Sequence, residues 1–565
     1  AGAKTSEEIA AYAVELLKSG RMKMAAEDPD APQNVPRVLL RWRANVLGAS
    51  AKGHEYFLKH LLGAQNAVLQ PEHAAMRPRE LAVREPAPEG KLDLLVTSDF
   101  RMTTSTLYSD VILPAATWYE MHDINTTDLH PFVHPFTAAV DPLWESKTNW
   151  DTFKKLAELF AALAVKHLGT RKDLVARPMM HDLENEIAQP SGKVRDWRKG
   201  EVEPVPGKTM PSLEVVTRDY ANVHLMQTAL GPRLLKEGVH AKGVKWDVSA
   251  QYEELKTRLG VAARTGLTAG MPYLASDRAA VETILALSPE TDGRASVSAW
   301  KNLGEKTGLP LARFGAPNES QRTTFGDING RPRRVMHSPV WTGFVSNQRS
   351  YAPFTVNIEE RVPFRTLSGR AHFYLDHQWM LEFGDALPTY RPPLNLATLG
   401  VADVPGVAKD RPEIVLRYLT PHSKWSINST FADTDIMTTL FRGGQAVWIN
   451  DEDAAAVGVS DADWVECFNV NGLVLARAIV SPRITRGKAF MYHAQERYLN
   501  VPISSLTNQR AGTHNSVTRI YIKPTQLIGA YAQLSFYPNY YGPIGCQRDE
   551  VIVLRKAREV VFDER

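Results

Sequence analysis

The sequence has 565 residues, 44% of them hydrophobic, so it is long enough for several domains with buried cores. Its 66 lysines and arginines nearly balance its 63 aspartates and glutamates, so the charge gives no reason to expect nucleic acid as a partner. Two cysteines, Cys467 and Cys546, exclude a disulfide framework and a self-contained iron–sulfur cluster, because both need more thiolates. No stretch approaches the roughly 18 apolar residues of a membrane span, so we expect attachment to a bilayer only through partners.

The amino terminus is typical of a helix start and not of a signal peptide. Thr5 or Ser6 is the expected cap, and Glu7 and Glu8 fall in the first turn, where carboxylates are favourable. Because the chain opens in a helix and has no initiating Met, we expect further polypeptide upstream.

Residues 1–170 are predicted to be α/β. Residues 94–96 and 111–113 are short apolar runs that end in polar residues or in Pro114, as buried parallel strands do. Apolar residues then recur at helical spacing over 152–167, and Gly169 ends the pattern.

Residues 171–405 are predicted to be an irregular and helical excursion. Residues 170–215 are rich in Pro, Lys and Asp without a sustained period, which indicates an irregular surface segment. Amphipathic helices are expected near 249–259 and 278–288.

Residues 406–565 are predicted to form a compact β-barrel with small helices. Asn471-Gly472 is typical of a type I′ turn between two strands, and a helix over 451–457 is expected between Asn450 as its cap and Gly458. The expected strands are 413–419, 445–449, 464–468 and 473–480.

The motif Thr97-Ser98-Asp99-Phe100, which holds Ser98 and Asp99, directly follows the first predicted strand. Ligands of open α/β sheets lie beyond the carboxyl ends of the strands, where a hydroxyl and a carboxylate suit a nucleotide base or ribose. A capped strand-to-helix turn needs the same residue types, and the sequence leaves both interpretations open.

A loop rich in hydrogen-bond donors follows the predicted strand 413–419. Hydroxyls, an imidazole, an ammonium and an amide in one loop suit an oxygenated, anionic ligand such as a pyrophosphate or a pterin. A polar surface turn is the alternative, although Trp425 and Ile427 indicate partial burial. The candidate binding residues are Thr420, Pro421, His422, Ser423, Lys424, Trp425, Ser426, Ile427, Asn428 and Ser429.

A third polar cluster contains His493, His514 and Asn515, with arginines close by in the sequence. Such side chains donate to phosphates, and a neutral imidazole can donate to a pterin nitrogen. A hydrogen-bonded core network is the alternative. Asn539 and Arg548 belong to a further polar loop near the carboxyl end.

Histidines and aspartates between 122 and 134 invite a metal site, since both are ligands of first-row metals. Pro131 and Pro135 interrupt the segment and no helical pair of ligands is available, so irregular loop packing is the better interpretation. A phosphate-binding glycine loop and a nucleophile elbow are both missing from the sequence. The residues of this segment are His122, Asp123, Asp128, His130 and His134.

Four long motifs carry a family resemblance. They are Leu107-Tyr-Ser-Asp-Val-Ile-Leu-Pro-Ala-Ala-Thr-Trp-Tyr-Glu, Asn125-Thr-Thr-Asp-Leu-His-Pro-Phe-Val-His-Pro, Met491-Tyr-His-Ala-Gln-Glu-Arg and His514-Asn-Ser-Val-Thr-Arg. The sequence resembles the molybdopterin oxidoreductase family, and within it the branch of respiratory nitrate reductase and nitrite oxidoreductase α subunits. The resemblance runs along the whole chain and corresponds to the carboxyl-terminal half of such a subunit.

The resemblance implies a partial α/β molybdopterin-oxidoreductase domain, a 171–405 excursion that completes the catalytic domain, and a double-psi-type β-barrel over 406–565. It implies molybdenum held by two molybdopterin guanine dinucleotides, which carry the redox chemistry. The metal ligands and a 4Fe-4S cluster are expected in an amino-terminal half outside this sequence, so no catalytic or metal-binding residue is assigned here. Residues that match cofactor-lining positions of the family are Asn45, Ser98, Asp99, Asn149, residues 420–429, His493, His514, Asn515, Asn539 and Arg548.

Three positions depart from the family pattern. Met121 stands where a lysine is frequent, which removes one charged contact to the nucleotide. Asn149 replaces an aspartate that can pair with guanine N–H donors. Asn428 replaces a second histidine of the 420–429 loop and cannot become cationic, so a shifted cofactor potential is expected.

By resemblance, the complete subunit interconverts nitrate and nitrite by oxygen-atom transfer. The implied partners are an iron–sulfur β subunit and a cytochrome b-type γ subunit, which would hold the subunit at the cytoplasmic face of the membrane. Two alternatives remain at this point: oxygen transfer to chlorate, selenate or a hydrocarbon, and a non-catalytic cofactor-binding or assembly module.

Overall fold

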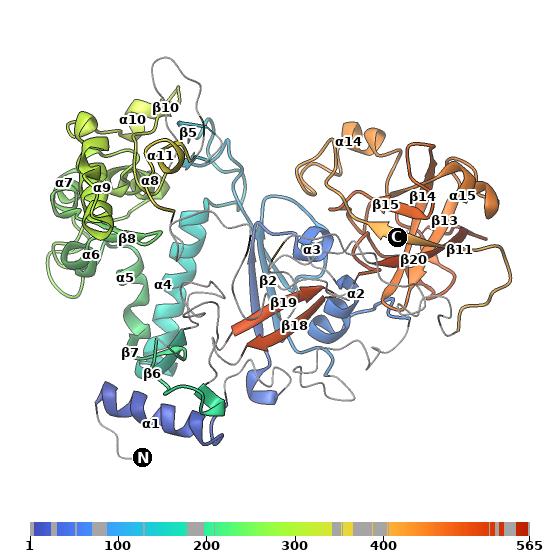
Figure 1. The fold of residues 1–565 in the computed structure, drawn as a ribbon, viewed down its shortest axis with the longest axis horizontal. Coiled ribbons are helices and arrows are strands. Elements are labelled where there is room, and N and C mark those ends of the chain that lie inside the picture. The colour runs from blue at the N-terminus through green and yellow to red at the C-terminus, as the bar shows by residue number, and fades with distance from the viewer. Residues whose placement is uncertain are drawn as a thin grey trace. The chain divides into compact units, whose positions relative to one another are not determined.

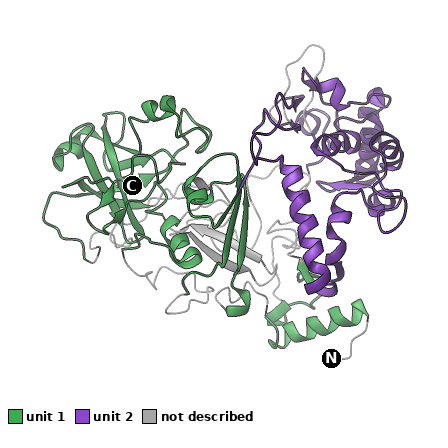
Figure 2. Ribbon diagram, turned by 180° about the vertical axis from the view of Figure 1, so that it is seen from behind, with its two compact units in different colours: residues 1–112, 175–214, 373–565 green, residues 113–174, 215–372 purple. Residues whose placement is uncertain are grey.

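The fold was analysed in a computed structural model. It describes residues 5–23, 31–50, 53–69, 88–127, 130–177, 197–207, 209–341, 352, 354–364, 374, 387, 404, 406–518, 520–525, 530–535 and 550–562. Two compact units emerge, and they are coloured separately in Figure 2. Unit 1 comprises 1–112, 175–214 and 373–565, and unit 2 comprises 113–174 and 215–372.

Unit 1 opens with helix α1 (Ser6–Lys18) (Figure 1). The predicted cap is confirmed, because the Thr5 side chain accepts from Glu8 N while the Glu8 carboxylate accepts from Thr5 N. Three strands then form a sheet in the order β1-β2-β3, and β1 runs parallel to β2. Their bounds are Val38–Trp42, Leu94–Asp99 and Val111–Pro114.

Strand β1 presents an apolar face to solvent. Val38, Leu40 and Trp42 alternate along the strand and are 61%, 45% and 51% exposed. Arg41 points to the opposite, buried face. Short helices follow these strands: a π-helix at Val46–Ser50, α2 at His54–Tyr56, a second π-helix at Phe57–Leu62 and α3 at Thr104–Leu107.

The carboxyl-terminal part of unit 1 is a closed barrel in the order β11-β15-β12-β14-β13-β20, which confirms the predicted barrel. Its interior is filled by side chains that alternate inward, among them Leu416, Val447 and Cys467. The strands are β11 (Ile414–Leu419), β12 (Ala446–Ile449), β13 (Trp464–Asn469), β14 (Gly472–Val480), β15 (Lys488–Met491) and β20 (Val551–Lys556), and the helices are α14 (Asp435–Leu440) and α15 (Asp451–Ala456). Two small antiparallel sheets accompany it: β16 (Ile503–Ser504) with β17 (Gln509–Arg510), and β18 (Ile520–Thr525) with β19 (Ala530–Ser535).

The predicted type I′ turn between β13 and β14 is wrong. The strands pair through Asn469 and Gly472, so the loop residues are Val470 and Asn471, and neither has a positive φ. Side-chain bonds set this turn instead, because Asn469 Oδ1 accepts from Asn471 N at 2.9 Å. Gly472 is required for packing, since a Cβ there would lie 2.4 Å from Ser516 O.

Unit 2 is mostly helical. Helices α4, α7 and α8 confirm the three predicted amphipathic segments. Gly293 is the first residue of α9, and no larger residue fits there, because an added Cβ would lie 1.7 Å from Asn318 O. Its helices are α4 (Asn149–His167), α5 (Val223–Gln227), α6 (Pro232–Glu237), α7 (Ser249–Leu259), α8 (Asp277–Leu287), α9 (Gly293–Thr307), α10 (Phe325–Ile328) and α11 (Thr355–Ile358). Its strands are β4 (Asp123–Asn125), β5 (Phe132–Phe136), β8 (Val239–Ala241), β9 (Val244–Trp246) and β10 (Arg333–Arg334).

The prediction that 170–215 is irregular is wrong at both ends of the segment. Strands β6 (Thr170–Arg177) and β7 (Ser212–Asp219) form a two-stranded sheet. Their charged composition hides the strand pattern, because neither strand has a buried residue among those whose burial is described. None of the described helices is long and apolar enough to cross a bilayer.

Candidate cofactor-binding site

Ser98 and Asp99 are the last two residues of β2, so the strand runs further than predicted. They do not cap a helix, because α3 begins at Thr104 with Thr103 as its cap. Ser98 is 1% exposed, and its Oγ has no hydrogen-bond partner among the described residues. Burial raises the pKa of the Asp99 carboxyl, although Phe100 N donates to Asp99 Oδ1 at 2.8 Å.

The donor-rich loop 420–429 follows β11 and is largely exposed. The partial burial expected from its apolar residues is wrong, since Trp425 is 48% and Ile427 80% exposed. Lys424 Nζ lies 4.4 Å from the centre of the Trp425 ring. Only at Ser429 does the loop become buried, with 5% exposure.

Three imidazoles form a row that begins with His422 of this loop. The His422 and His493 rings lie 4.1 Å apart, and the His493 and His514 rings lie 6.3 Å apart. His493 Nε2 donates to Asn428 Oδ1 at 2.9 Å, and His493 N donates to Pro421 O at 3.0 Å. The second and third polar clusters of the sequence therefore lie together.

His514 and Asn515 are completely buried. The His514 ring accepts from Ala494 N at Nε2, at 3.1 Å, and Tyr418 Oη donates to His514 O at 2.9 Å. Asn515 O accepts from His54 N at 3.3 Å. These contacts build the two residues into the core between the barrel and α2.

Asn45 lies in a polar cluster that sequence reasoning missed in part. Asn45 Nδ2 donates to Ser429 Oγ and to Glu496 Oε1, both at 2.8 Å. Glu496 Oε2 accepts from Thr104 N at 2.7 Å and from Thr104 Oγ1 at 2.6 Å. Ser105 Oγ donates to Asn45 Oδ1 at 2.8 Å. Glu496, Thr104 and Ser105 come from distant segments, and only the polar run around His493 hinted at Glu496.

Arg101 also connects the two sides of the site. Its Nη1 donates to Ser429 O at 2.5 Å, and its Nη2 pairs with Asp433. The segment after β2 and the 420–429 loop are therefore joined directly through Arg101.

A buried ion pair adjoins this cluster. Arg497 Nη1 donates to Glu55 Oε1 at 3.1 Å, and the two residues are 4% and 0% exposed. His54 is neutral, with Nδ1 donating to Leu47 O at 2.6 Å and Nε2 accepting from Arg497 Nη1 at 3.0 Å. Burial, aided by the Arg497 charge and opposed by Glu55, lowers the pKa of His54 to about 4. Burial by itself would raise the pKa of Glu55. The positive charge of Arg497 and the hydrogen bonds to the carboxylate outweigh the effect of burial, so the pKa of Glu55 is lowered overall.

Asn149 belongs to the other compact unit, where it is the first residue of α4. Asn149 Nδ2 donates to Met121 Sδ at 3.7 Å, so two of the positions that the resemblance predicts to depart from the family pattern are in contact. Asn539 and Arg548 lie outside the described residues.

The histidine-rich segment that invites a metal site forms strands β4 and β5. Asp128 lies outside the described residues. His122 faces Asp277, with 3.6 Å between Nδ1 and Oδ2, and the His130 and His134 rings pack 4.8 Å apart. Among the described residues there is no group of three or more His, Cys, Asp or Glu side chains placed to hold a metal ion.

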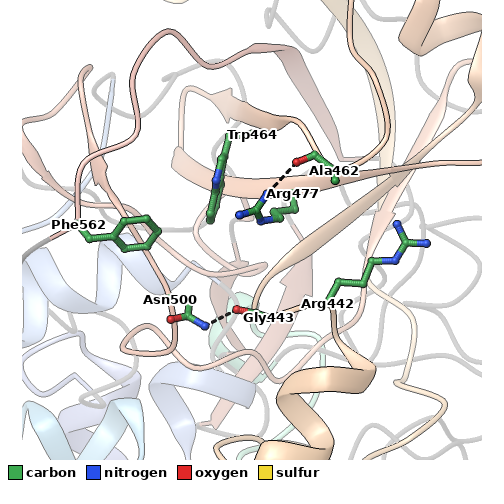
Figure 3. Close-up of a pocket in the computed structure, with 7 residues that line it drawn as sticks. All are labelled: Arg442, Gly443, Ala462, Trp464, Arg477, Asn500 and Phe562. Carbon is green, nitrogen blue, oxygen red and sulfur yellow. Dashed lines mark hydrogen bonds between the residues drawn. The ribbon is translucent and has the colours of Figure 1, made fainter.

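A separate cavity of about 460 Å³ lies on the barrel in unit 1 (Figure 3). Arg477 stacks on Trp464, with 4.9 Å between the guanidinium and the ring centre, and it donates to Ala462 O at 3.0 Å. No predicted site residue lines this cavity. Its lining residues are Arg442, Gly443, Ala462, Trp464, Arg477, Asn500 and Phe562.

Among the described site residues of unit 1, Ser98, His422 and Lys424 fit an oxygenated, anionic cofactor. Ser98 Oγ is buried without a partner among the described residues and requires one from elsewhere. The 420–429 loop presents the side chains of Lys424 and His422 to solvent, and both can donate to phosphate.

Three protein families match successive parts of the chain. Residues 5–159 match "Molybdopterin oxidoreductase", residues 237–359 match "Nitrate reductase alpha chain, domain V", and residues 416–534 match "Molydopterin dinucleotide binding domain". The predicted resemblance and the predicted cofactor class are confirmed by these descriptions.

Curated relatives match over nearly the whole chain. The nitrate reductase alpha chain of Bacillus subtilis is 48% identical over 99% of this chain and 45% of its own length. The respiratory nitrate reductase 2 alpha chain of Escherichia coli is 46% identical over 97% of this chain and 44% of its own. The nitrate reductase alpha subunit of Mycobacterium tuberculosis is 46% identical over 97% and 45%. The chain thus spans a little under half the length of these relatives.

Proposed function

The chain belongs to the molybdopterin oxidoreductase family, and on that premise we propose that the complete subunit interconverts nitrate and nitrite by oxygen-atom transfer. In the reducing direction, nitrate, two electrons and two protons give nitrite and water. The observation that carries the proposal is the match to nitrate reductase alpha chains over nearly the whole of this chain. The contacts of the 420–429 loop support it. His493 bonds to this loop, and Arg101 and Asn45 join the loop to the segments that follow β2 and β1.

The residues of this chain act by binding and positioning. When bound, the molybdenum cofactor supplies a metal that gains or loses an oxygen atom while its oxidation state changes by two. The Lys424 ammonium opposes phosphate charge from the exposed loop, and the His422 imidazole can donate a hydrogen bond to a phosphate oxygen. Ser98 and Asp99, at the end of β2, offer a hydroxyl and a carboxylate to the base or ribose.

The other predicted site residues keep a proposed role at the cofactor, and that of Asn45 is indirect, through the loop. Asn45 and His493 are bonded to Ser429 and Asn428 of the loop and shape it from the protein side. His514 and Asn515 are completely buried and stay in the proposed set on the strength of the family resemblance. Asn149, Asn539 and Arg548 stay part of the proposed set on the strength of the family resemblance alone.

The architecture proposed for the whole subunit extends beyond this chain. We propose that the barrel is of the double-psi type, that domain boundaries fall near 170 and 405, and that a 4Fe-4S cluster lies in the amino-terminal half. An iron–sulfur β subunit and a cytochrome b-type γ subunit are the proposed partners, and they would hold the subunit at the cytoplasmic face of the membrane.

The test uses the full-length subunit purified with its partners. We expect molybdenum and guanine nucleotide, released by acid hydrolysis, at two guanines per metal. We also expect turnover of nitrate or nitrite in preference to chlorate and selenate. A preparation with neither molybdenum nor guanine would support a non-catalytic module, and a preference for another oxyanion would replace the proposed substrate.

A further inference from the structure

Glu496 is a buried carboxylate that accepts from donors of two other segments, and the Ser429 side chain also hydrogen-bonds to it. It is 1% exposed, and its oxygens accept from Asn45 Nδ2 at 2.8 Å, from Thr104 N at 2.7 Å and from Thr104 Oγ1 at 2.6 Å. Only a side chain with two oxygens free to accept can satisfy these three donors at once.

Asn45 passes this constraint on to the 420–429 loop. Its two amide hydrogens go to Glu496 Oε1 and Ser429 Oγ, and its Oδ1 accepts from Ser105 Oγ at 2.8 Å and Gly48 N at 3.1 Å. The amide has no capacity left for a cofactor in this arrangement. Asn45 therefore acts on the loop and does not donate to a ligand.

Glu496 and its neighbour Arg497 are both bonded to Thr104. Arg497 N donates to Thr104 Oγ1 at 2.7 Å, and its guanidinium pairs with Glu55. His493, three residues earlier, meets Asn428 of the same loop. The 493–497 segment is thus held on one side by the α/β part of unit 1 and contacts the loop on the other.

We propose that Glu496 is a positioning residue, which sets the place of Ser429 through Asn45 and so orders the 420–429 loop before the cofactor binds. This rests on the proposed function only in naming what the loop holds. The geometry of the loop therefore depends on a hydrogen bond in which the side chain at position 45 donates and the side chain at position 496 accepts.

The exchange of roles provides the sharpest test. Glu496→Gln puts an amide N–H₂ against donors on at least one side, so the bond to Asn45 or the bonds to Thr104 fail. When Asn45→Asp is combined with Glu496→Gln, the new amide at position 496 donates to the new carboxylate at position 45, and the amide oxygen accepts from Thr104. The carboxylate also accepts from Ser105 and Gly48, as the native amide oxygen does, and the Ser429 hydroxyl turns to donate. The donors of Thr104, Ser105, Gly48 and Ser429 again have acceptors, and one N–H of the new amide is satisfied by the new carboxylate.

Amide hydrogen exchange of the full-length subunit, made with and without molybdenum cofactor, reads the loop directly. Glu496→Gln should speed exchange of peptides over 420–430 about tenfold or more, while peptides from α9 in unit 2 stay unchanged. The double variant should restore the slow exchange. Glu452→Gln, at an exposed carboxylate on the same barrel, should change nothing.

Three results would overturn the proposal: unchanged loop exchange in Glu496→Gln, equal acceleration in α9, or no rescue by the double variant. If Glu496→Gln fails to fold, Ser429→Ala carries the test, because it removes only the loop end of the chain of bonds and should loosen the loop alone. In loaded protein, the molybdenum midpoint potential should move in Glu496→Gln and return in the double variant. Wild-type protein without molybdenum would refute the proposed function, while exchange in the cofactor-free protein would still decide the role of Glu496.

Discussion

His493 Nε2 donates to Asn428 Oδ1 across 2.9 Å, and this bond joins segments 65 positions apart in the chain. Asn428 has φ 50°, a left-handed conformation that asparagine and histidine tolerate better than most residues. An imidazole can therefore replace this amide without added backbone strain, which makes the departure from the family pattern experimentally reversible.

Asn428→His should raise the midpoint potential of molybdenum by about 30 mV or more, which for a two-electron couple is about 1.4 kcal/mol. An imidazole that takes up a proton stabilises the more negative, reduced cofactor, which an amide cannot do. A redox titration of the full-length subunit measures the shift. Asn508→His is the matched control, because Asn508 has φ 52° and is exposed in the β16–β17 turn. Equal potentials in all three proteins would remove the tuning role.

Arg497→Met should destabilise unit 1 by about 3–5 kcal/mol, because it leaves the Glu55 carboxylate buried without its cation. The double variant with Glu55→Gln should lose less than the two single losses added together. Calorimetric melting of the full-length subunit compares the variants. Arg442→Met is the control, since the Arg442–Asp461 pair is 48% and 51% exposed and should contribute about 1 kcal/mol or less. Additive losses would mean that the pair is not coupled.

Stability should fall as the pH drops from about 6.5 towards 4. The folded pKa of His54 is lowered to about 4 from an ordinary 6.5, so the unfolded chain binds the proton first in that window. The stabilising effect is complete above pH 6.5 and is lost progressively below it, by about 3 kcal/mol in all. His54→Gln should flatten the melting temperature over that range. Glu55, whose folded pKa is also depressed, adds a loss only at lower pH. An unaltered slope in the variant would contradict the assignment.

Gly472→Ala should cost about 1–3 kcal/mol by overpacking. A Cβ at this position would meet Ser516 O at 2.4 Å and Glu55 Cγ at 2.8 Å, which pushes on the buried ion pair. Gly231→Ala is a fair comparison, because nothing lies within 4 Å of its added Cβ. Melting temperatures of the two variants measure the difference, and similar values would show that the loop around Ser516 yields freely.

Elements with strong local patterns were predictable from the sequence. The Thr5 cap, the helix over 152–167 and the barrel strands depend on spacing within a few residues, and the structure confirms them. The type I′ turn was wrong because the Asn469 side chain and the approach of Ser516 decide the geometry there, and neither is visible in the dipeptide Asn471-Gly472.

The site was predictable as a set of polar clusters but not as a network. His493 and the 420–429 loop were singled out separately, and their contact depends on the closure of the barrel. Glu496 was missed because its donors Asn45 and Thr104 lie 451 and 392 positions away. The exposure of Ile427 was also beyond reach, since an apolar residue in a loop carries no sign of which way it points.

The open side of β1 has a practical consequence for handling the protein. Parallel sheets in folded domains are covered on both faces, yet Val38, Leu40 and Trp42 line up towards solvent. Produced by themselves, these 565 residues should stick to one another through that stripe and precipitate. Charged replacements at these three positions should therefore keep the material in solution.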